Sequence, residues 1–295
     1  MTSQQNKIEN QGNLKRVSRR KFLGLMAAGI SIACGGPVFY ASAIEPNTIE
    51  INHLTIPLPG LAPDLHGLRL VQLSDLHAGM WLGRDHLVRV AQRALDLAPD
   101  LILITGDFMT AGGDDEQAAG DLNAALKLLT GAVPVMAVRG NHDHGPRESA
   151  LSAVFAQTGI LELANTIQSV DRGGGSLYIA GIDSVSTGHQ GLHQVVQTAP
   201  SGAPIILLAH EPDMADYSAP TGKFAFQISG HSHGGQVRLP LLGRVILPWM
   251  ARKYPAGLYQ IGGMILYTNR GIGTIHMPFR LNCPPEITVF TLAPA

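Results

Sequence analysis

The sequence predicts an α/β fold with a β-rich second half. Short apolar runs of strand length alternate with segments whose apolar residues recur at helical spacing. In the second half, the strand-like runs outnumber the helical segments. Polar residues stand directly after several strand-like runs, which is where α/β sheets form their sites. Together these three observations indicate one α/β body with a site at the carboxyl ends of its strands.

The first half of this body predicts strands and helices in alternation. Strands are expected over 48–58, 68–74, 101–106 and 133–140, and helices over 83–100, 121–129 and 146–158. The apolar residues of the first helical segment share one face: Leu87, Val90, Ala91, Ala94 and Leu97. LILITG at 101–106 is almost continuously apolar, which predicts a strand buried on both faces.

The second half predicts mainly strands. They are expected over 176–183, 204–210 and 224–230, and the segments 259–271 and 286–292 are typical of hairpin-rich β structure. No repeat and no linker-like stretch follows residue 50, so we expect a single domain over 44–295.

The composition excludes several classes of protein. The chain has 295 residues, of which 45% are hydrophobic and 15% are charged, which excludes an intrinsically disordered chain. Only one segment lacks charge over about 20 residues, so a polytopic membrane protein is excluded as well. Residues 44–295 carry a net charge of −6, which argues against nucleic acid as the main partner.

Residues 1–43 predict an export signal or anchor. A basic stretch precedes 22 uncharged residues that end in Ala41-Ser42-Ala43, the order of a secretory signal. SRRKFLG at 18–24 resembles the twin-arginine motif. We therefore expect the twin-arginine export machinery as a partner, and the periplasm or the outer face of the cytoplasmic membrane as the destination. An ordinary N-terminal anchor and a lipoprotein linked through Cys34 are the alternatives.

Polar residues follow five of the predicted strands, and we expect them to converge on one crevice. These residues are Asp75, Asp107, Asn141, His210 and His231. The strand alternation turns Asp75 and His77 to the same side, and His233 stands two residues after His231. Gly106 allows the turn that faces the Asp107 carboxylate to the site, where its two oxygens can bridge two ions.

Each of these residues alone has a structural explanation. Asp75 or Asp107 could cap a helix, Asn141 could hold a left-handed turn, and His210 could be a core histidine. Their joint order favours a metal site. Four imidazoles with carboxylates and one amide are too rich in nitrogen for Ca²⁺ or Mg²⁺, so the set favours Mn, Fe or Zn without choosing among them.

Five motifs carry a resemblance to a known family: SDLH (74–77), TGDF (105–108), RGNHDH (139–144), LAHE (208–211) and SGHSHGGQ (229–236). In this order they resemble the calcineurin-like metallophosphoesterase superfamily. With NRGIGT and CPPEIT behind a twin-arginine signal, the chain is similar to its exported bacterial phosphodiesterase branch (YaeI/YkuE-like). The resemblance implies a metallophosphoesterase-type four-layer α-β-β-α sandwich with mixed sheets.

The resemblance also implies a dinuclear hydrolase. Its first metal ion would be held by Asp75, His77, Asp107 and His233, and its second by Asp107, Asn141, His210 and His231. A hydroxide bridging the two ions would hydrolyse a P–O bond. His142 would stay unligated beside the scissile phosphate and protonate the leaving alkoxide.

One position departs from the family pattern. Many relatives carry a second Asp three residues after the bridging one, where this chain has Thr110. Either Asp114 or Asp115 replaces that carboxylate, or His142 is oriented in another way.

The substrate class stays open at this point. A phosphodiester, as a small molecule or a lipid head group, is the leading interpretation. The alternatives are a pyrophosphatase acting on a UDP- or lipid-linked sugar and a non-catalytic envelope binding protein. The last should have lost a ligand or His142, and all are present.

Two apolar stretches, 78–83 and 237–253, flank the predicted site. The second stretch interleaves basic residues with Leu, Ile, Val and Trp249. It could lie on a membrane surface, but we expect a hairpin that packs on the core. Arg270, in a glycine-rich loop, is a further candidate for a position near the site.

Overall fold

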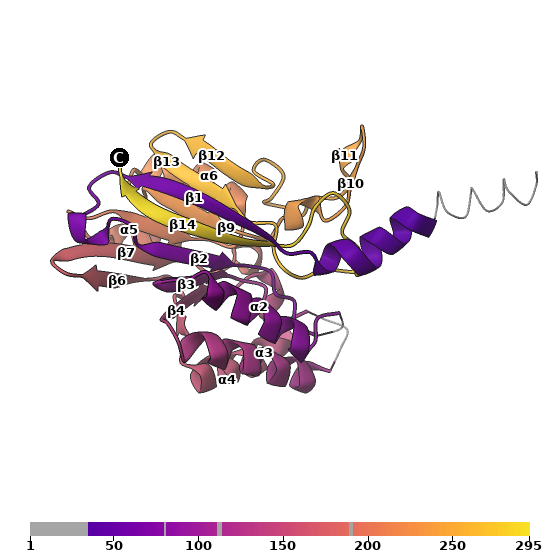
Figure 1. Cartoon of the computed structure of the whole chain (residues 1–295). Helices are drawn as coiled ribbons and strands as arrows, with labels where there is room; N and C mark the ends of the chain where they lie inside the picture. The colour runs from indigo at the N-terminus through magenta and orange to yellow at the C-terminus, as the bar shows by residue number, and fades with distance from the viewer. Residues whose placement is uncertain (1–34, 80, 111–113, 189–190) are drawn as a thin grey trace, which may run out of the picture. The chain divides into compact units, whose positions relative to one another are not determined.

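The computed structural model describes residues 35–79, 81–110, 114–188 and 191–295 (Figure 1). The chain divides into the units Met1–Tyr40 and Ala41–Ala295, and the fold below is that of the second unit. The predicted twin-arginine motif and Cys34 lie outside the described residues. Within the part that is described, no helix combines the length and the apolar composition that crossing a membrane requires.

Two six-stranded sheets form the body. The first has the order β1 (Glu50–Leu58), β14 (Glu286–Pro294), β2 (Arg69–Leu73), β3 (Leu101–Thr105), β4 (Val135–Val138) and β5 (Leu161–Glu162). The second has the order β12 (Gly257–Ile261), β13 (Met264–Thr268), β9 (Phe226–Ser229), β8 (Ile205–Leu208), β7 (Gly175–Gly181) and β6 (Thr166–Arg172). Both sheets contain parallel and antiparallel pairs, which confirms the predicted mixed sheets.

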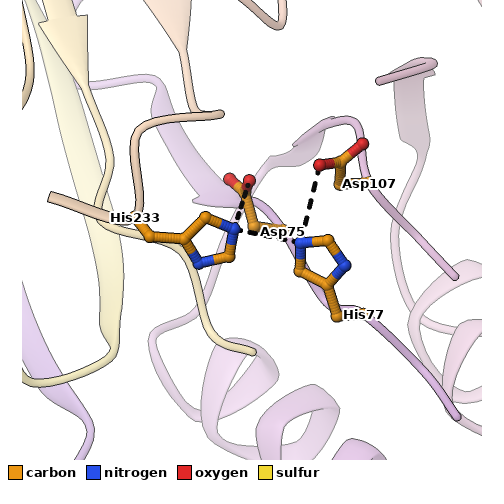
Figure 2. A group of neighbouring side chains, drawn as sticks. All are labelled: Asp75, His77, Asp107 and His233. Atoms are coloured by element: carbon orange, nitrogen blue, oxygen red, sulfur yellow. Dashed lines mark hydrogen bonds and ion pairs between the residues drawn. The ribbon is translucent and has the colours of Figure 1, made fainter. Parts of the chain in front are cut away.

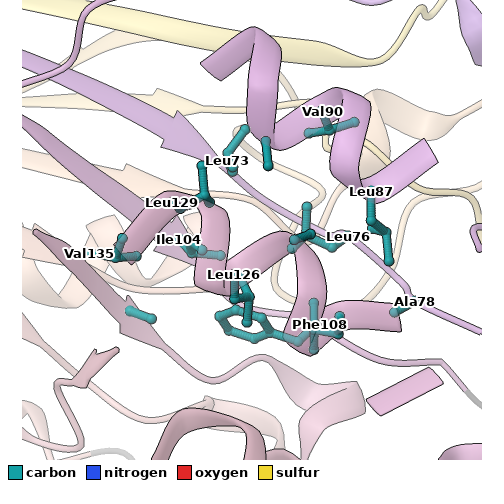
Figure 3. Close-up of a cluster of buried hydrophobic side chains, with 14 of the residues drawn as sticks. Leu73, Leu76, Ala78, Leu87, Val90, Ile104, Phe108, Leu126, Leu129 and Val135 are labelled. Carbon is teal, nitrogen blue, oxygen red and sulfur yellow. The ribbon is translucent and has the colours of Figure 1, made fainter. Parts of the chain in front are cut away.

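Helices cover the outer faces of both sheets. The helices are α2 (Arg84–Asp96), α3 (Asp115–Thr130), α4 (Glu148–Thr158), α5 (Leu192–Thr198) and α6 (Ala215–Ser218). Residues of α2, α3 and α4 form one apolar core with the first sheet (Figure 3). Val195 of α5 and Ala215 of α6 form another core with the second sheet.

The strand alternation supplies a third core between the sheets. Ile102 and Ile104 of β3 face the helices, whereas Leu101 and Leu103 face the second sheet. Leu208 of β8 lies in the same inter-sheet core. The layers are therefore α-β-β-α, as the family resemblance implied. Strands such as β3 are buried on both faces because every residue has a core to enter.

Several elements differ from the prediction. Helix α3 begins six residues early because the Asp114 carboxylate caps it, accepting hydrogen bonds from Glu116 N and Gln117 N. Four elements were not predicted from the sequence. β5 and α6 are too short to give a periodic signal, and β6 and α5 have weakly apolar faces. β14 is not part of a hairpin. It lies between β1 and β2, parallel to one and antiparallel to the other.

The 237–253 stretch contains the expected hairpin, but the expectation that its apolar residues pack on the core holds only at its end, where Met250 contacts the core of the second sheet. β10 (Arg238–Leu239) and β11 (Gly243–Arg244) form a separate two-stranded hairpin. The side chain of Leu241 at its tip is fully exposed. Apolar residues in sequence indicate burial only where a second layer exists to cover them.

Candidate metal centre

The carboxyl ends of the central strands meet at one crevice. Asp75 follows β2 and Asp107 follows β3 in the first sheet, while His210 follows β8 and His231 follows β9 in the second. All four side chains are buried. The structure thus brings together residues that are up to 156 positions apart in the chain, counted from Asp75 to His231.

A first group of ligand-type atoms comes from Asp75, His77, Asp107 and His233 (Figure 2). His77 Nε2 lies 3.0 Å from His233 Nε2 and 3.5 Å from Asp107 Oδ2. His233 Nε2 lies 3.3 Å from Asp75 Oδ1. Imidazole nitrogens and carboxylate oxygens that converge at this spacing fit the ligand set of a single transition-metal cation.

A second group comes from Asp107, His210 and His231. His210 Nε2 lies 3.3 Å from Asp107 Oδ2 and 3.1 Å from His231 Nδ1. The same Asp107 oxygen therefore faces both groups. Its other oxygen, Oδ1, accepts a hydrogen bond of 2.9 Å from the backbone N–H of His142.

Asn141 adds an amide oxygen to this region. It follows β4, the neighbour of β3, and its Oδ1 is buried without a hydrogen-bond partner in the described chain. A buried acceptor left unpaired costs about 1–3 kcal/mol. This oxygen is thus suited to be a metal ligand, and the residues present fit the metal pair that the resemblance implied.

Backbone carbonyls fix the tautomers of two histidines. His210 Nδ1 lies 2.7 Å from Thr105 O, and His231 Nε2 lies 2.8 Å from Trp249 O. Because a carbonyl can only accept, these ring nitrogens carry the protons. In the neutral ring of each residue, the lone pair is then on His210 Nε2 or His231 Nδ1, the atoms that face the site as ligand atoms must.

The ligand loops have a left-handed backbone. Asp75, His77 and Asp107 have φ of 50°, 48° and 56°, and His231 and His233 have φ of 66° and 49°. For a non-glycine residue this conformation costs roughly 1–2 kcal/mol. Strain of this kind persists where the surroundings dictate the conformation, and such places cluster at functional sites.

Asp143 is one source of that constraint. Its buried carboxylate accepts hydrogen bonds from the backbone N–H groups of Gly140 and Asp107 at 2.8 Å and of Phe108 at 2.7 Å. The loop after β3 is thereby fastened to the loop after β4. Asp143 belongs to the RGNHDH motif but not to the predicted ligand set, and it is the anchor of the Asp107 loop.

Glycines permit the close approach of these loops. Gly106 has φ +94°, and a Cβ there would lie 2.5 Å from Gly140 N and 2.7 Å from His210 Nδ1. A Cβ on Gly230 would collide with Ser74 Oγ and the Asp75 carboxylate. The turn expected at Gly106 is present, and a side chain at either position would push ligand loops apart.

Burial and charge set the protonation of the ligands. Burial alone would raise the pKa of Asp107, but the neighbouring His210 and His77 hold that pKa well below its usual range. Burial lowers the pKa of His77 to about 3, despite the opposing charge of Asp107. Asp107 is thus an anion and His77 a neutral imidazole at neutral pH, which are the forms that bind metal.

His142 lies beside the ligands and not among them. It is half-buried, and its ring stands edge-on to His77 with centroids 5.1 Å apart. Asp114 makes its side-chain hydrogen bonds to the backbone of α3, and among the described residues neither Asp114 nor Asp115 is hydrogen-bonded to this ring. The hydrogen bond from His142 N to Asp107 Oδ1 instead fixes the backbone that carries the side chain.

The candidate Arg270 and two polar residues next to the ligands, Glu211 and His144, have other partners. Arg270 does not point into the site, since its guanidinium forms ion pairs with Glu50, at 2.8 Å, and with Glu286. Glu211 is buried and accepts a hydrogen bond of 2.5 Å from Ser184 Oγ. His144 pairs with Asp183 at 2.9 Å.

Arg280 was missed by the sequence analysis. It is completely buried, and its guanidinium donates to the carbonyl oxygens of Arg270, Gly271, Gly273 and Cys283. The loop it holds donates in turn from Ile272 N to Ser74 O and from Gly273 N to Asp75 O. A single arginine in an irregular segment gives no periodic or motif signal that could have revealed this support.

Comparisons with known proteins agree with the geometry. The profile of the calcineurin-like phosphoesterase family matches residues 68–235, a range that includes all seven predicted ligands. The uncharacterized metallophosphoesterase YkuE of Bacillus subtilis is 34% identical over 289 residues, covering 95% of this chain and 99% of YkuE. The phosphodiesterase YaeI of Escherichia coli is 27% identical over 281 residues, covering 94% of this chain and 99% of YaeI. The UDP-2,3-diacylglucosamine pyrophosphatase LpxG of Chlamydia muridarum is 28% identical over 308 aligned residues, covering 85% of this chain and 91% of LpxG.

Proposed function

The chain belongs to the calcineurin-like phosphoesterase family, and we propose from this premise that it is a phosphodiesterase of the cell envelope. The family and the buried Asp and His cluster make it a metallophosphoesterase. One observation carries the proposal: Asp107 Oδ2 lies 3.5 Å from His77 Nε2 in one ligand group and 3.3 Å from His210 Nε2 in the other. A carboxylate shared in this way suits two adjacent cations.

The donor set supports Mn, Fe or Zn as the metals, since imidazole nitrogen, carboxylate and amide oxygen suit these ions together. Asp75, His77 and His233 would hold the first ion, and Asn141, His210 and His231 the second, with Asp107 on both. When bound, two divalent cations supply Lewis acidity, which polarises the phosphoryl group and makes hydroxide available near neutral pH.

The chain's own residues then provide the binding and the proton. His142, which is half-buried beside the ligands, would bind a phosphoryl oxygen and donate a proton to the leaving alkoxide. Its backbone N–H meanwhile holds Asp107 Oδ1, so the proton donor and the shared ligand are positioned by one contact.

Similarity to YaeI supports a phosphodiester substrate, and similarity to LpxG supports a pyrophosphate as the second candidate. The test is to load the purified full chain with Mn²⁺ and compare bis(p-nitrophenyl) phosphate with a UDP-sugar. Faster turnover of the diester would support the proposal, and faster turnover of the UDP-sugar would replace it by a pyrophosphatase. Two bound ions without turnover of either would indicate a binding protein.

The envelope location rests on the N-terminal sequence. Arg19→Lys with Arg20→Lys should retain the chain in the cytoplasm and leave its folding intact, because the twin-arginine pathway reads the paired arginines. The measurement is the amount of protein in periplasmic and cytoplasmic fractions, with Lys15→Arg as the matched control. Export of the double variant at the normal rate would contradict the assignment.

A further inference from the structure

Residues 238–249, here called the hairpin segment, leave an apolar surface uncovered by the described chain. Five of its large apolar side chains are more than half exposed: Leu241 (107%), Leu242 (78%), Ile246 (75%), Trp249 (58%) and Val245 (54%). Large exposed apolar side chains gathered in so short a stretch of chain indicate a place where another molecule binds.

The backbone at the tip points the same way. The β10–β11 ladder has two residue pairs, Arg238 with Arg244 and Leu239 with Gly243, and one hydrogen bond from Val245 N to Val237 O extends it. Leu241, in its turn, has φ +68°, a conformation that Gly or Asn adopts more readily than a bulky side chain. Neither the local conformation nor packing within the described residues explains a leucine here, which indicates a partner outside them.

Charge identifies the partner. From Gln236 to Lys253 the chain has Arg238, Arg244, Arg252 and Lys253 and no acidic residue, within a body of net charge −6. The side chains of Arg244 and Arg252 are exposed, while Lys253 is paired with Asp216. Exposed apolar side chains flanked by arginines suit a bilayer of anionic lipids, because the lipid phosphates meet the guanidinium groups.

The hairpin segment is joined to the metal centre at both ends. At its start, Arg238 Nε donates to Gly234 O, next to the ligand His233, at 2.8 Å. At its end, Trp249 O accepts from His231 Nε2 at 2.8 Å. In between, Arg244 packs against Gly235, where a Cβ would lie 2.9 Å from that of Arg244.

We propose that the hairpin segment docks on the surface of an anionic lipid bilayer, and that the substrate is the phosphodiester head group of a lipid at that surface. The proposal rests on the proposed function for its chemistry. Docking through this segment places the ligand loops Gly230–Gln236 beside the layer of lipid phosphates. A substrate head group then reaches the metal centre without leaving the bilayer.

The chain has two tryptophans, Trp81 and Trp249. The test uses the full chain with Trp81→Phe, so that all tryptophan fluorescence comes from Trp249. Its fluorescence is measured with vesicles of phosphatidylcholine and phosphatidylglycerol that carry brominated acyl chains. We expect a blue shift and quenching of Trp249, both weakened when salt screens the arginines. Vesicle attachment through the N-terminal segment alone would leave Trp249 unquenched.

Two variants in this background separate the alternatives. Leu241→Asp with Ile246→Asp should remove the quenching, whereas Leu258→Asp, at an exposed apolar position of β12 away from the hairpin segment, should keep it. Bound protein with Trp249 unquenched, or quenching that survives the double change, would overturn the proposal. If Trp249 stays unquenched and the parent is a dimer that the double change dissociates, the surface binds a second copy of the chain.

Activity distinguishes this proposal from the proposed function. The ratio of turnover on vesicle phosphatidylglycerol to turnover on soluble bis(p-nitrophenyl) phosphate should fall at least about tenfold in the double variant, as expected when surface binding is lost. Quenching without turnover of any diester would support docking and overturn the proposed function. Diester turnover with an unquenched Trp249 would do the reverse.

Discussion

Left-handed backbone occurs both in the ligand loops and at the hairpin tip, and the two regions differ in what holds it. Asp75 and Asp107 are buried, and their loops are tied together by hydrogen bonds from Asp75 N to Gly106 O and from His77 N to Asp107 O. Leu241 is fully exposed on a hairpin of two residue pairs. The backbone strain of the ligand loops is offset by hydrogen bonds and burial within the molecule. The described chain supplies no such contacts for the backbone strain at the hairpin tip.

The difference shows how to recognise the two kinds of functional surface. A metal centre must fix its ligands before the metal arrives, so its strain comes with anchors such as Asp143 and Arg280. A docking surface needs only to present side chains, so it keeps an unfavourable residue without anchors. The following predictions alter one region at a time.

His142→Ala should have the largest effect of these changes. Turnover should fall by roughly 10²–10⁴-fold, the usual value of a positioned acid, while metal content stays near that of the parent. The loss should be greater for an alkyl ester than for a nitrophenyl ester, because nitrophenolate needs little protonation to leave. Steady-state kinetics on both esters decide this, and equal losses would show that His142 binds phosphate without acting as the acid.

Asp143→Asn tests the anchor of the Asp107 loop. The amide nitrogen would face backbone N–H groups that now donate to a carboxylate, so metal affinity or activity should fall by about 10–100-fold. We also expect a loss of about 1–3 kcal/mol in the free energy of unfolding, because a buried donor is left unpaired. Competitive Mn²⁺ titration and chemical denaturation measure the two effects. Asp183→Asn, which alters a carboxylate near the site but off the Asp107 loop, is the control.

Arg280→Met tests the support behind Asp75. Four carbonyl oxygens lose their donor, and the 270–273 loop that contacts Ser74 and Asp75 is loosened. We expect the ion of the Asp75 group to bind about tenfold more weakly and the ion of the His210 group to be little affected. Arg280→Lys should restore part of the loss. Equal weakening of both ions would point to general destabilisation.

Leu241→Asn should have the smallest effect of these changes, and it should stabilise the folded chain where the others weaken stability or function. Asn tolerates φ +68° better than Leu does, so the free energy of unfolding should rise by about 0.5 kcal/mol. Thermal unfolding of the two proteins without lipid measures it. A decrease would mean that Leu241 packs within the chain after all.

Much of the fold and of the candidate site could be predicted from the sequence, because their signals are local. The apolar runs of β3 and β8 identify strands with two covered faces, and the polar residues that follow identify the crevice. The prediction that Asp75 and His233 bind the same ion required the family resemblance, because no local pattern shows which loops meet. The structure brings Asp75, His77, Asp107 and His233 together in one group, and Asp107, His210 and His231 in another.

The rest depends on contacts that no local pattern encodes. β14 joins the first sheet through pairing with residues more than 200 positions away. Arg280 acts through carbonyl groups, which every residue has. For residues 241–246 the sequence gives hydrophobicity but not exposure, because exposure depends on whether a layer lies opposite.

Counting the bound ions tests most directly whether Asp107 joins two metal ions. The full chain and its Asp107→Asn variant are loaded with Mn²⁺, separated from excess metal, and assayed for metal per chain by mass spectrometry. We expect two ions per chain in the parent, and at most one in the variant together with loss of diester hydrolysis. Two ions and normal turnover in the variant would contradict it.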